Sequence, residues 1–136
     1  DGRAVGTMAL QRADTANRVI EVGWVIYSER LKRSRIATEA QFLLAQYVFE
    51  TLRYRRYEWK CDALSQASRR AAERLGFRFE GVFRQAVVYK GRNRDTAWFA
   101  MLDSEWPQIK RRMQRWLAEE NFDEQGRQRV PLQEME

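Results

Sequence analysis

The sequence predicts an α+β (mixed α/β) fold, in which a central mixed, mostly antiparallel sheet is flanked by helices. Strand-type alternation and helical periodicity follow one another in the order β-β-α-β-α-β-β-α. A helix between the second and third strands permits a parallel crossover. The last two strands are joined by a short turn, which is typical of an antiparallel pair.

The first half of the chain is predicted to form a hairpin and a helix. Residues 4–12 and 18–27 alternate as strands do, and the Asp and Asn at 13–17 favour a turn between them. A basic loop follows at 28–35. Residues 36–52 carry apolar side chains at helical spacing, which predicts a helix.

The middle of the chain supplies three further strands. A strand at 57–63 precedes a short helix at 65–75, which Gly76 is placed to end. The strands at 77–90 and 96–102 follow. Together these elements would extend the sheet begun by the first hairpin.

The last helix is predicted at residues 104–119, with Ser104 as its N-cap. Its apolar face contains Trp106 and Trp116, which would cover either the chain's own sheet or the partner in a homodimer. Residues 120–136 are predicted to be a polar tail. The sequence therefore indicates one domain, residues 1–119, followed by that tail.

The composition excludes several classes of protein. The 136 residues contain no histidine, which excludes histidine-based triads and most zinc sites, and no metal site is expected. The single cysteine, Cys61, suits a reducing compartment, so a cytoplasmic location without membrane association is expected. The net charge of +6, from 25 Lys and Arg against 19 Asp and Glu, suits a polyanionic partner.

The basic loop before the first helix is a candidate phosphate site. Residues 32–35 read Lys-Arg-Ser-Arg and lie directly before the predicted helix. The start of a helix presents N–H groups without intrahelical acceptors and the positive end of the helix dipole. The loop therefore predicts a phosphorylated cofactor.

Four segments, in order, resemble one known family. They are EVGW at 21–24, the basic loop with ATEA at 37–40, CDALSQAS at 61–68 and RLGFRFEG at 74–81. This set is similar to the GNAT acetyltransferase superfamily, in its branch of RimJ/RimL-type ribosomal-protein N-terminal acetyltransferases. The resemblance implies the GNAT fold, acetyl-CoA as cofactor and a primary amine as acceptor. It also implies that the first strand and early helices of the family are absent from this chain.

The resemblance assigns the cofactor-binding residues by position. The pantetheine arm of the cofactor would pair with the strand at 18–27, and the pyrophosphate would bind the basic loop. Residues of the helix at 65–75 would also contact the cofactor. Arg35 departs from the central glycine of the family's loop, where it would add a charged phosphate contact, and Ser65 departs from an asparagine. The implied residues are Trp24, Val25, Ile26, Lys32, Arg33, Ser34, Arg35, Ile36, Ala37, Thr38, Ser65, Ser68 and Arg69.

Transfer to an amine needs a base for the amine and a proton for the leaving thiolate. Glu21 is the leading base candidate by position, with a solvent-facing strand residue as the alternative interpretation. Glu39 is a second candidate, although a Glu early in a helix also complements the dipole. Ser68 is the acid candidate through the resemblance, with helix capping as the alternative. Tyr57 or Tyr89 would be the substitute donors.

Three functions follow from these features. The first is an acetyl-CoA-dependent N-acetyltransferase that acts on a protein N-terminus or a small-molecule amine. The second is a non-catalytic CoA-binding or interaction domain with the same fold, which the departures at Arg35 and Ser65 motivate. The third, a nucleic-acid binder, rests on net charge alone and is placed last, because the aromatic residues lie at core spacing.

Overall fold

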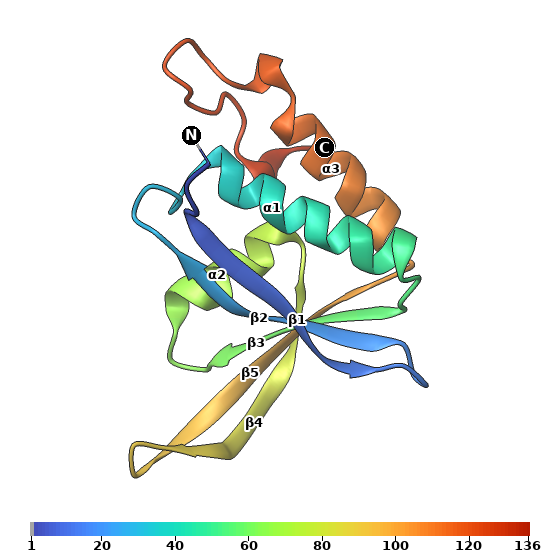
Figure 1. The fold of residues 1–136 in the computed structure, drawn as a ribbon, viewed down its shortest axis with the longest axis vertical. Helices are drawn as coiled ribbons and strands as arrows, with labels where there is room; N and C mark the ends of the chain where they lie inside the picture. The colour runs from blue at the N-terminus through green and yellow to red at the C-terminus, as the bar shows by residue number, and fades with distance from the viewer. Residues whose placement is uncertain (1) are drawn as a thin grey trace.

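A five-stranded sheet forms the centre of the computed structural model, which describes residues 2–136 (Figure 1). The strand order is β1-β2-β3-β5-β4, with only β2 and β3 parallel. The predicted α+β fold, with its hairpin, crossover and mostly antiparallel sheet, is thereby confirmed. The strands are β1 (Gly6–Asp14), β2 (Val19–Tyr27), β3 (Arg56–Asp62), β4 (Arg78–Tyr89) and β5 (Arg92–Leu102).

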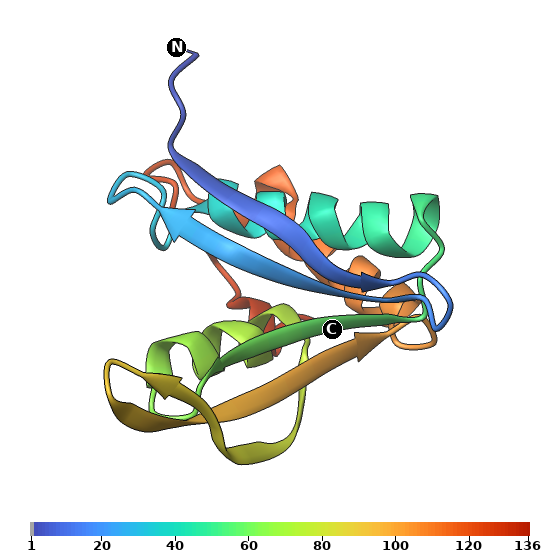
Figure 2. The ribbon, with the colours of Figure 1, turned by 60° about the horizontal axis from the view of Figure 1, so that its bottom comes forward.

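The helices α1 (Arg35–Gln46), α2 (Gln66–Leu75) and α3 (Trp106–Leu117) lie on one face of the sheet (Figure 2). The first helix ends in a π-helical turn at Tyr47–Thr51, so the α-helical part is shorter than predicted. Among the described residues, no helix is both long and apolar enough to span a bilayer.

Two further predicted boundaries were wrong. Strand β5 begins at Arg92 rather than at residue 96, because the hairpin with β4 turns at Lys90 and Gly91 and pairs Tyr89 with Arg92. The N-cap position of α3 is occupied by Glu105 rather than Ser104, and Pro107 lies in the first helical turn. Proline is favoured there because its missing N–H needs no acceptor.

Side chains along β3 alternate between the two faces of the sheet, with aromatic residues on one face and charged residues on the other. Tyr57 and Trp59 point toward the helices, where Tyr57 lies 5.3 Å and Trp59 lies 5.4 Å from the ring centroid of Phe77. Trp106 of α3 stacks on Phe49 at 5.4 Å. Arg56, Glu58 and Lys60 occupy the intervening positions of β3. Their side chains therefore lie on the opposite, helix-free face.

The C-terminal residues required a correction, because they are packed and not a free polar tail. Leu132 is only 1% exposed and belongs to the main core. Asn121 is also buried, and its side-chain amide donates to the carbonyl oxygens of Trp116 and Val130 at 3.0 and 3.2 Å. Trp106 and Trp116 are themselves buried in this chain. One predicted alternative was that these two side chains cover the partner in a homodimer. That alternative needs them to be exposed, and they are not.

The end of α2 provides a stability prediction. Gly76 has φ +107°, and a Cβ there would lie 3.2 Å from side-chain atoms of Ile109. Gly76→Ala is expected to lower the free energy of unfolding by about 1–3 kcal/mol, measured by urea denaturation. Gly126→Ala is the matched control, because Gly126 has φ +79° and open space around it. An equal loss of unfolding free energy in both variants would show that the close approach to Ile109 does not destabilise the protein.

Candidate functional site

The sheet opens between its two parallel strands. Pairing between β2 and β3 covers Val19–Glu21 and Arg56–Glu58 only, and the strands then diverge (Figure 2). Trp24 adopts φ +51°, and the β1–β2 register shifts beside it, which indicates a bulge in β2. Beyond Glu21, the β2 edge that faces β3 is therefore free to pair with an extended ligand.

A cavity of about 680 Å³ lies near the divergent ends of these strands. Tyr27 from the end of β2 and Trp59 from β3 line it, together with the start of α1, the last turn of α2, Phe122 and residues 126–128. Its charged lining residues are all arginines and include no Asp or Glu. They are Arg33, Arg35, Arg74 and Arg127.

The start of α1 forms one wall of the cavity. Ser34 is the N-cap, and its Oγ accepts a hydrogen bond from the Ala37 N–H at 3.1 Å. Within the described part of the chain, no acceptor pairs with the N–H groups of Arg35 and Ile36. Arg33 has φ +57°, a left-handed conformation that favours glycine. The glycine-like position is thus Arg33, whereas Arg35, expected there from the family motif, is an ordinary helical residue.

Two of the arginines are held by neutral groups. Arg35 donates to the Leu117 carbonyl oxygen at 2.6 Å and lies 4.3 Å from the Phe122 ring centroid. Arg74 donates to Thr38 Oγ1 at 3.0 Å, and burial lowers the pKa of its guanidinium from the usual value. An arginine nevertheless stays charged. Because their partners carry no charge, both remain able to attract an anion.

A buried amide adds an unpaired acceptor to the cavity wall. Gln41 is 4% exposed and donates through Nε2 to the Tyr27 hydroxyl at 2.8 Å. Its Oε1 is buried without a hydrogen-bond partner among the described residues. Leaving a buried polar atom unpaired is unfavourable, so this oxygen is suited to accept an N–H from a bound ligand.

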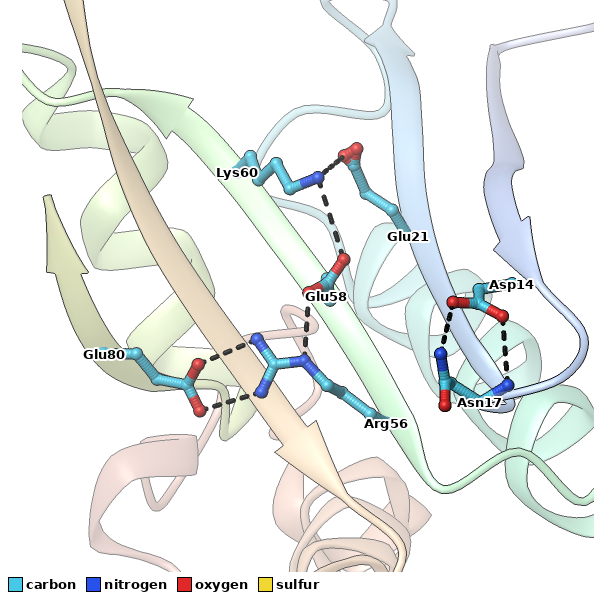
Figure 3. Close-up of polar contacts among 7 residues, drawn as sticks. All are labelled: Asp14, Asn17, Glu21, Arg56, Glu58, Lys60 and Glu80. Atoms are coloured by element: carbon cyan, nitrogen blue, oxygen red, sulfur yellow. Dashed lines mark hydrogen bonds and ion pairs between the residues drawn. The ribbon is translucent and has the colours of Figure 1, made fainter. Parts of the chain in front are cut away.

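Glu21 lies where β2 and β3 begin to separate (Figure 3). Its side chain is inside the protein, with the residue only 3% exposed, so the alternative interpretation as a solvent-facing residue is wrong. Oε1 accepts from Gln11 Nε2 at 3.1 Å, and Oε2 lies 3.5 Å from Lys60 Nζ. These contacts hold the carboxylate beside the opening between the strands.

Glu21 belongs to a chain of charges across the helix-free face (Figure 3). Lys60 Nζ is also 3.7 Å from Glu58 Oε1, and Glu58 Oε2 accepts from Arg56 Nε at 2.9 Å. Arg56 then makes two hydrogen bonds to Glu80, which hold the pKa of that carboxyl below its usual range. Opposite charges alternate along the chain, which offsets the cost of removing Glu21 from water.

Gly23 makes the Gln11 contact possible. A Cβ at Gly23 would lie 2.1 Å from Gln11 Nε2, which is closer than any real contact. Gln11 is the cross-strand partner of Glu21 in the β1–β2 register, and glycine at position 23 leaves room for its amide beside Glu21. The EVGW segment thus combines the carboxylate, the glycine beside it and the bulged Trp24 within four residues.

The chain is similar in sequence to known proteins. The sequence model of the acetyltransferase (GNAT) domain matches residues 1–78. The chain belongs to the GNAT acetyltransferase family. It is 32% identical over 106 residues to YdaF of Bacillus subtilis (strain 168), a protein provisionally named a ribosomal N-acetyltransferase. That match covers 78% of this chain and 57% of YdaF, so the chain spans little more than half of this relative.

Two solved structures are similar to this GNAT chain. A GCN5-related N-acetyltransferase from Brucella melitensis is 60% identical, with a TM-score of 0.94 over 96% of this chain and 59% of its own. A probable GNAT-family acetyltransferase from Chromobacterium violaceum ATCC 12472 is 50% identical, with a TM-score of 0.76 over 79% of this chain and 54% of its own. The predicted family and fold are therefore confirmed.

The cavity brings together only part of the predicted cofactor site. Arg33, Ser34, Arg35, Ala37 and Thr38 line it. The bulged strand residues Trp24, Val25 and Ile26 lie instead on β2 beside the opening.

Other predicted cofactor residues have structural partners outside the cavity. Lys32 pairs with Glu29 at 2.6 Å, and Ile36 is exposed. Arg69 donates to the Ala63 carbonyl oxygen at 2.9 Å.

The remaining predicted site residues, including the candidate acids and bases, lie in different environments. Ser65 is the N-cap of α2, and Ser68 Oγ accepts from Trp59 Nε1 at 3.1 Å. Burial raises the pKa of Tyr57, which makes that phenol a poor proton donor. Glu39 is exposed and lies beyond the first turn of α1, so the dipole interpretation does not apply to it. Tyr89 is exposed at the end of β4.

Among the cavity residues that sequence reasoning missed are Gln41, Arg74 and Arg127. Gln41 was assigned only to the first helix, and the helical spacing of apolar residues predicted a different buried face, on which Ile36, Leu43 and Tyr47 are in fact exposed. Arg74 is 36 residues from Thr38, its hydrogen-bond partner. Nothing in the local pattern indicated that distant contact, nor that Arg127 would return to the start of α1.

Proposed function

We propose that the chain binds acetyl-CoA in the arginine-lined cavity and transfers the acetyl group to a primary amine. The observation that carries the proposal is the arginine lining, without carboxylates, at a helix N-terminus beside an open strand edge. Arginine and helix N-termini are both suited to phosphate groups. Membership of the GNAT family supports the same cofactor.

The cofactor would lie along the opening between β2 and β3. Its pyrophosphate would accept hydrogen bonds from the N–H groups of Arg35 and Ile36, with Arg33 and Arg35 nearby. The pantetheine amides would pair with the β2 edge at Trp24–Ile26, as an added strand does. This placement would bring the thioester toward Glu21.

In the proposed reaction, the amine nitrogen attacks the thioester carbonyl carbon. The C–N bond forms, the C–S bond breaks, and CoA leaves as a thiolate. Glu21 would accept the proton that the amine loses, directly or through a water molecule. A donor must then protonate the thiolate, and Ser68 remains the candidate, supported by its place near the start of α2. The β2 and β3 edges would exclude water around the thioester.

For the acceptor, we propose the N-terminal amine of a protein. The support is the similarity to YdaF, whose name assigns it to ribosomal N-acetylation. A small-molecule amine is the competing acceptor. Thiol release from acetyl-CoA, measured with peptides that carry free or blocked N-termini and with polyamines, separates the two classes.

Arg74→Gln is expected to weaken acetyl-CoA binding by about tenfold, because it removes a charged donor from the cavity. Isothermal titration calorimetry measures this change. Arg70→Gln is the matched control, because Arg70 is exposed on the same helix and does not line the cavity. Absence of wild-type binding at millimolar acetyl-CoA would refute the proposed cofactor. Binding without thiol release for any amine would instead favour the non-catalytic alternative.

A further inference from the structure

The segment after α3 contributes a wall of the cavity that the family motifs did not include. Phe122 and residues 126–128 line the cavity, and Phe122 contacts Arg35 at the start of α1. Phe122 and Gln128 form an isolated antiparallel bridge, so the residues between them make a short closed loop. This loop, residues 122–128, is called here the C-terminal loop. Its position makes it part of whatever site the cavity forms.

The C-terminal loop is anchored to the body of the protein. Gln128 Oε1 accepts from Trp116 Nε1 at 3.0 Å, and the Trp116 and Phe122 rings meet edge to face with centroids 5.1 Å apart. On the other side, Arg35 of α1 lies over the Phe122 ring. The loop is therefore joined both to α3 and to the predicted phosphate-binding helix.

Arg127 is held in place by its own loop. Asp123 accepts from the Arg127 N–H at 2.9 Å and from its Nε at 3.1 Å, while Nη2 donates to Gln125 Oε1 at 3.2 Å. Within residues 2–136, no acceptor pairs with Nη1. The side chain is 74% exposed, so Arg127 lies at the rim of the cavity, in contrast to the half-buried Arg74.

We infer that the C-terminal loop recognises the 3′-phosphate of CoA, with Arg127 as its phosphate contact. This inference rests on the proposed function. CoA is a long molecule with its thioester at one end and a 3′-phosphorylated adenosine at the other. If the pyrophosphate occupies the start of α1 and the thioester approaches Glu21, the adenosine end points away from the sheet and toward the cavity rim.

Charge supports the assignment of this second phosphate. A phosphomonoester carries about two negative charges at neutral pH, in addition to those of the pyrophosphate. The N–H groups of α1 with Arg33 and Arg35 can hold the pyrophosphate, which leaves Arg127 at the rim for the 3′-phosphate. Asp123 and Gln125 orient the guanidinium through Nε and Nη2, and Nη1 is left to donate to the phosphate. The Asp123 carboxylate offsets part of the Arg127 charge, so only a modest contribution to affinity is expected.

The test compares CoA with 3′-dephospho-CoA by calorimetry on the full chain. The wild type is expected to bind CoA about fivefold more tightly, as for one exposed charge contact. Arg127→Gln is expected to bring the ratio of the two dissociation constants close to one, with little change for 3′-dephospho-CoA. Arg129→Gln is the matched control with an unchanged ratio, because Arg129 donates to the Glu120 carbonyl oxygen and does not line the cavity.

The outcomes separate this inference from the proposed function. Equal binding of the two ligands by the wild type would overturn the role of the C-terminal loop while leaving acetyl-CoA binding intact. Equal weakening of both ligands in Arg127→Gln would also overturn it, since that pattern indicates a purely structural arginine. Failure of the wild type to bind either ligand would instead refute the proposed function.

Discussion

Glu21→Gln is expected to lower the rate of acetyl transfer by about 10²–10⁴-fold while leaving acetyl-CoA affinity unchanged, because the proposed base would be lost. Glutamine has nearly the same shape and keeps an oxygen for the 3.1 Å hydrogen bond from Gln11. Glu21 does not line the arginine cavity. The measurement is single-turnover thiol release at saturating acetyl-CoA, together with calorimetric titration of the cofactor.

Glu58→Gln is the matched control for this prediction. Glu58 pairs with Glu21 in the β2–β3 register and shares the Lys60 ammonium group with it. Both variants disturb the same chain of charges, but only one removes the proposed base. A far smaller rate loss is therefore expected for Glu58→Gln. If both variants lose activity equally, or Glu21→Gln stays within about threefold of the wild type, the role of Glu21 as base is wrong.

Leu132→Ala is expected to lower the free energy of unfolding by about 2–5 kcal/mol, measured by urea denaturation. Leu132 is 1% exposed and packs in the same core as the sheet and the three helices. Removing its side chain leaves a cavity beneath the last turn of the chain. The loss would show that residues after α3 belong to the cooperative unit that folds with the sheet.

Val130→Ala is the comparison within the same segment. Val130 is 38% exposed, so its truncation removes less buried surface, and a loss below about 1 kcal/mol is expected. If Leu132→Ala lowered the free energy of unfolding no more than Val130→Ala does, the C-terminal segment would contribute little to folding. Its role as a preformed wall of the cavity would then lose its physical basis.

Local patterns predicted the main elements because each depends on neighbours in the chain. The β1–β2 hairpin followed from alternation on both sides of the turn, where the Asn17 N–H donates to Asp14 Oδ1 at 3.0 Å. Gly76 ends α2 in the left-handed conformation that the sequence predicted. The boundaries that differed lie at the end of α1, at the start of α3 and at the β4–β5 turn.

The environment of each candidate residue depended on contacts between distant segments. Glu21 was singled out from its position in EVGW, but its burial comes from β1 and β3, which supply Gln11 and Lys60. The Arg35 guanidinium reaches Leu117, 82 residues further on, and the segment predicted as a tail returns to face it. No periodicity in the sequence encodes such pairings directly.

The basic loop, the helix that follows it and the order of helices and strands along the chain were determined by the sequence alone, because residue type and spacing control local structure. The position of β5 between β3 and β4 was decided by the tertiary structure. The arginine-lined cavity, the unpaired Gln41 oxygen and the alternating charges around Glu21 were decided by the tertiary structure. The reason is physical: burial and the electric field at a side chain depend on every segment packed around it, including segments far away in the chain.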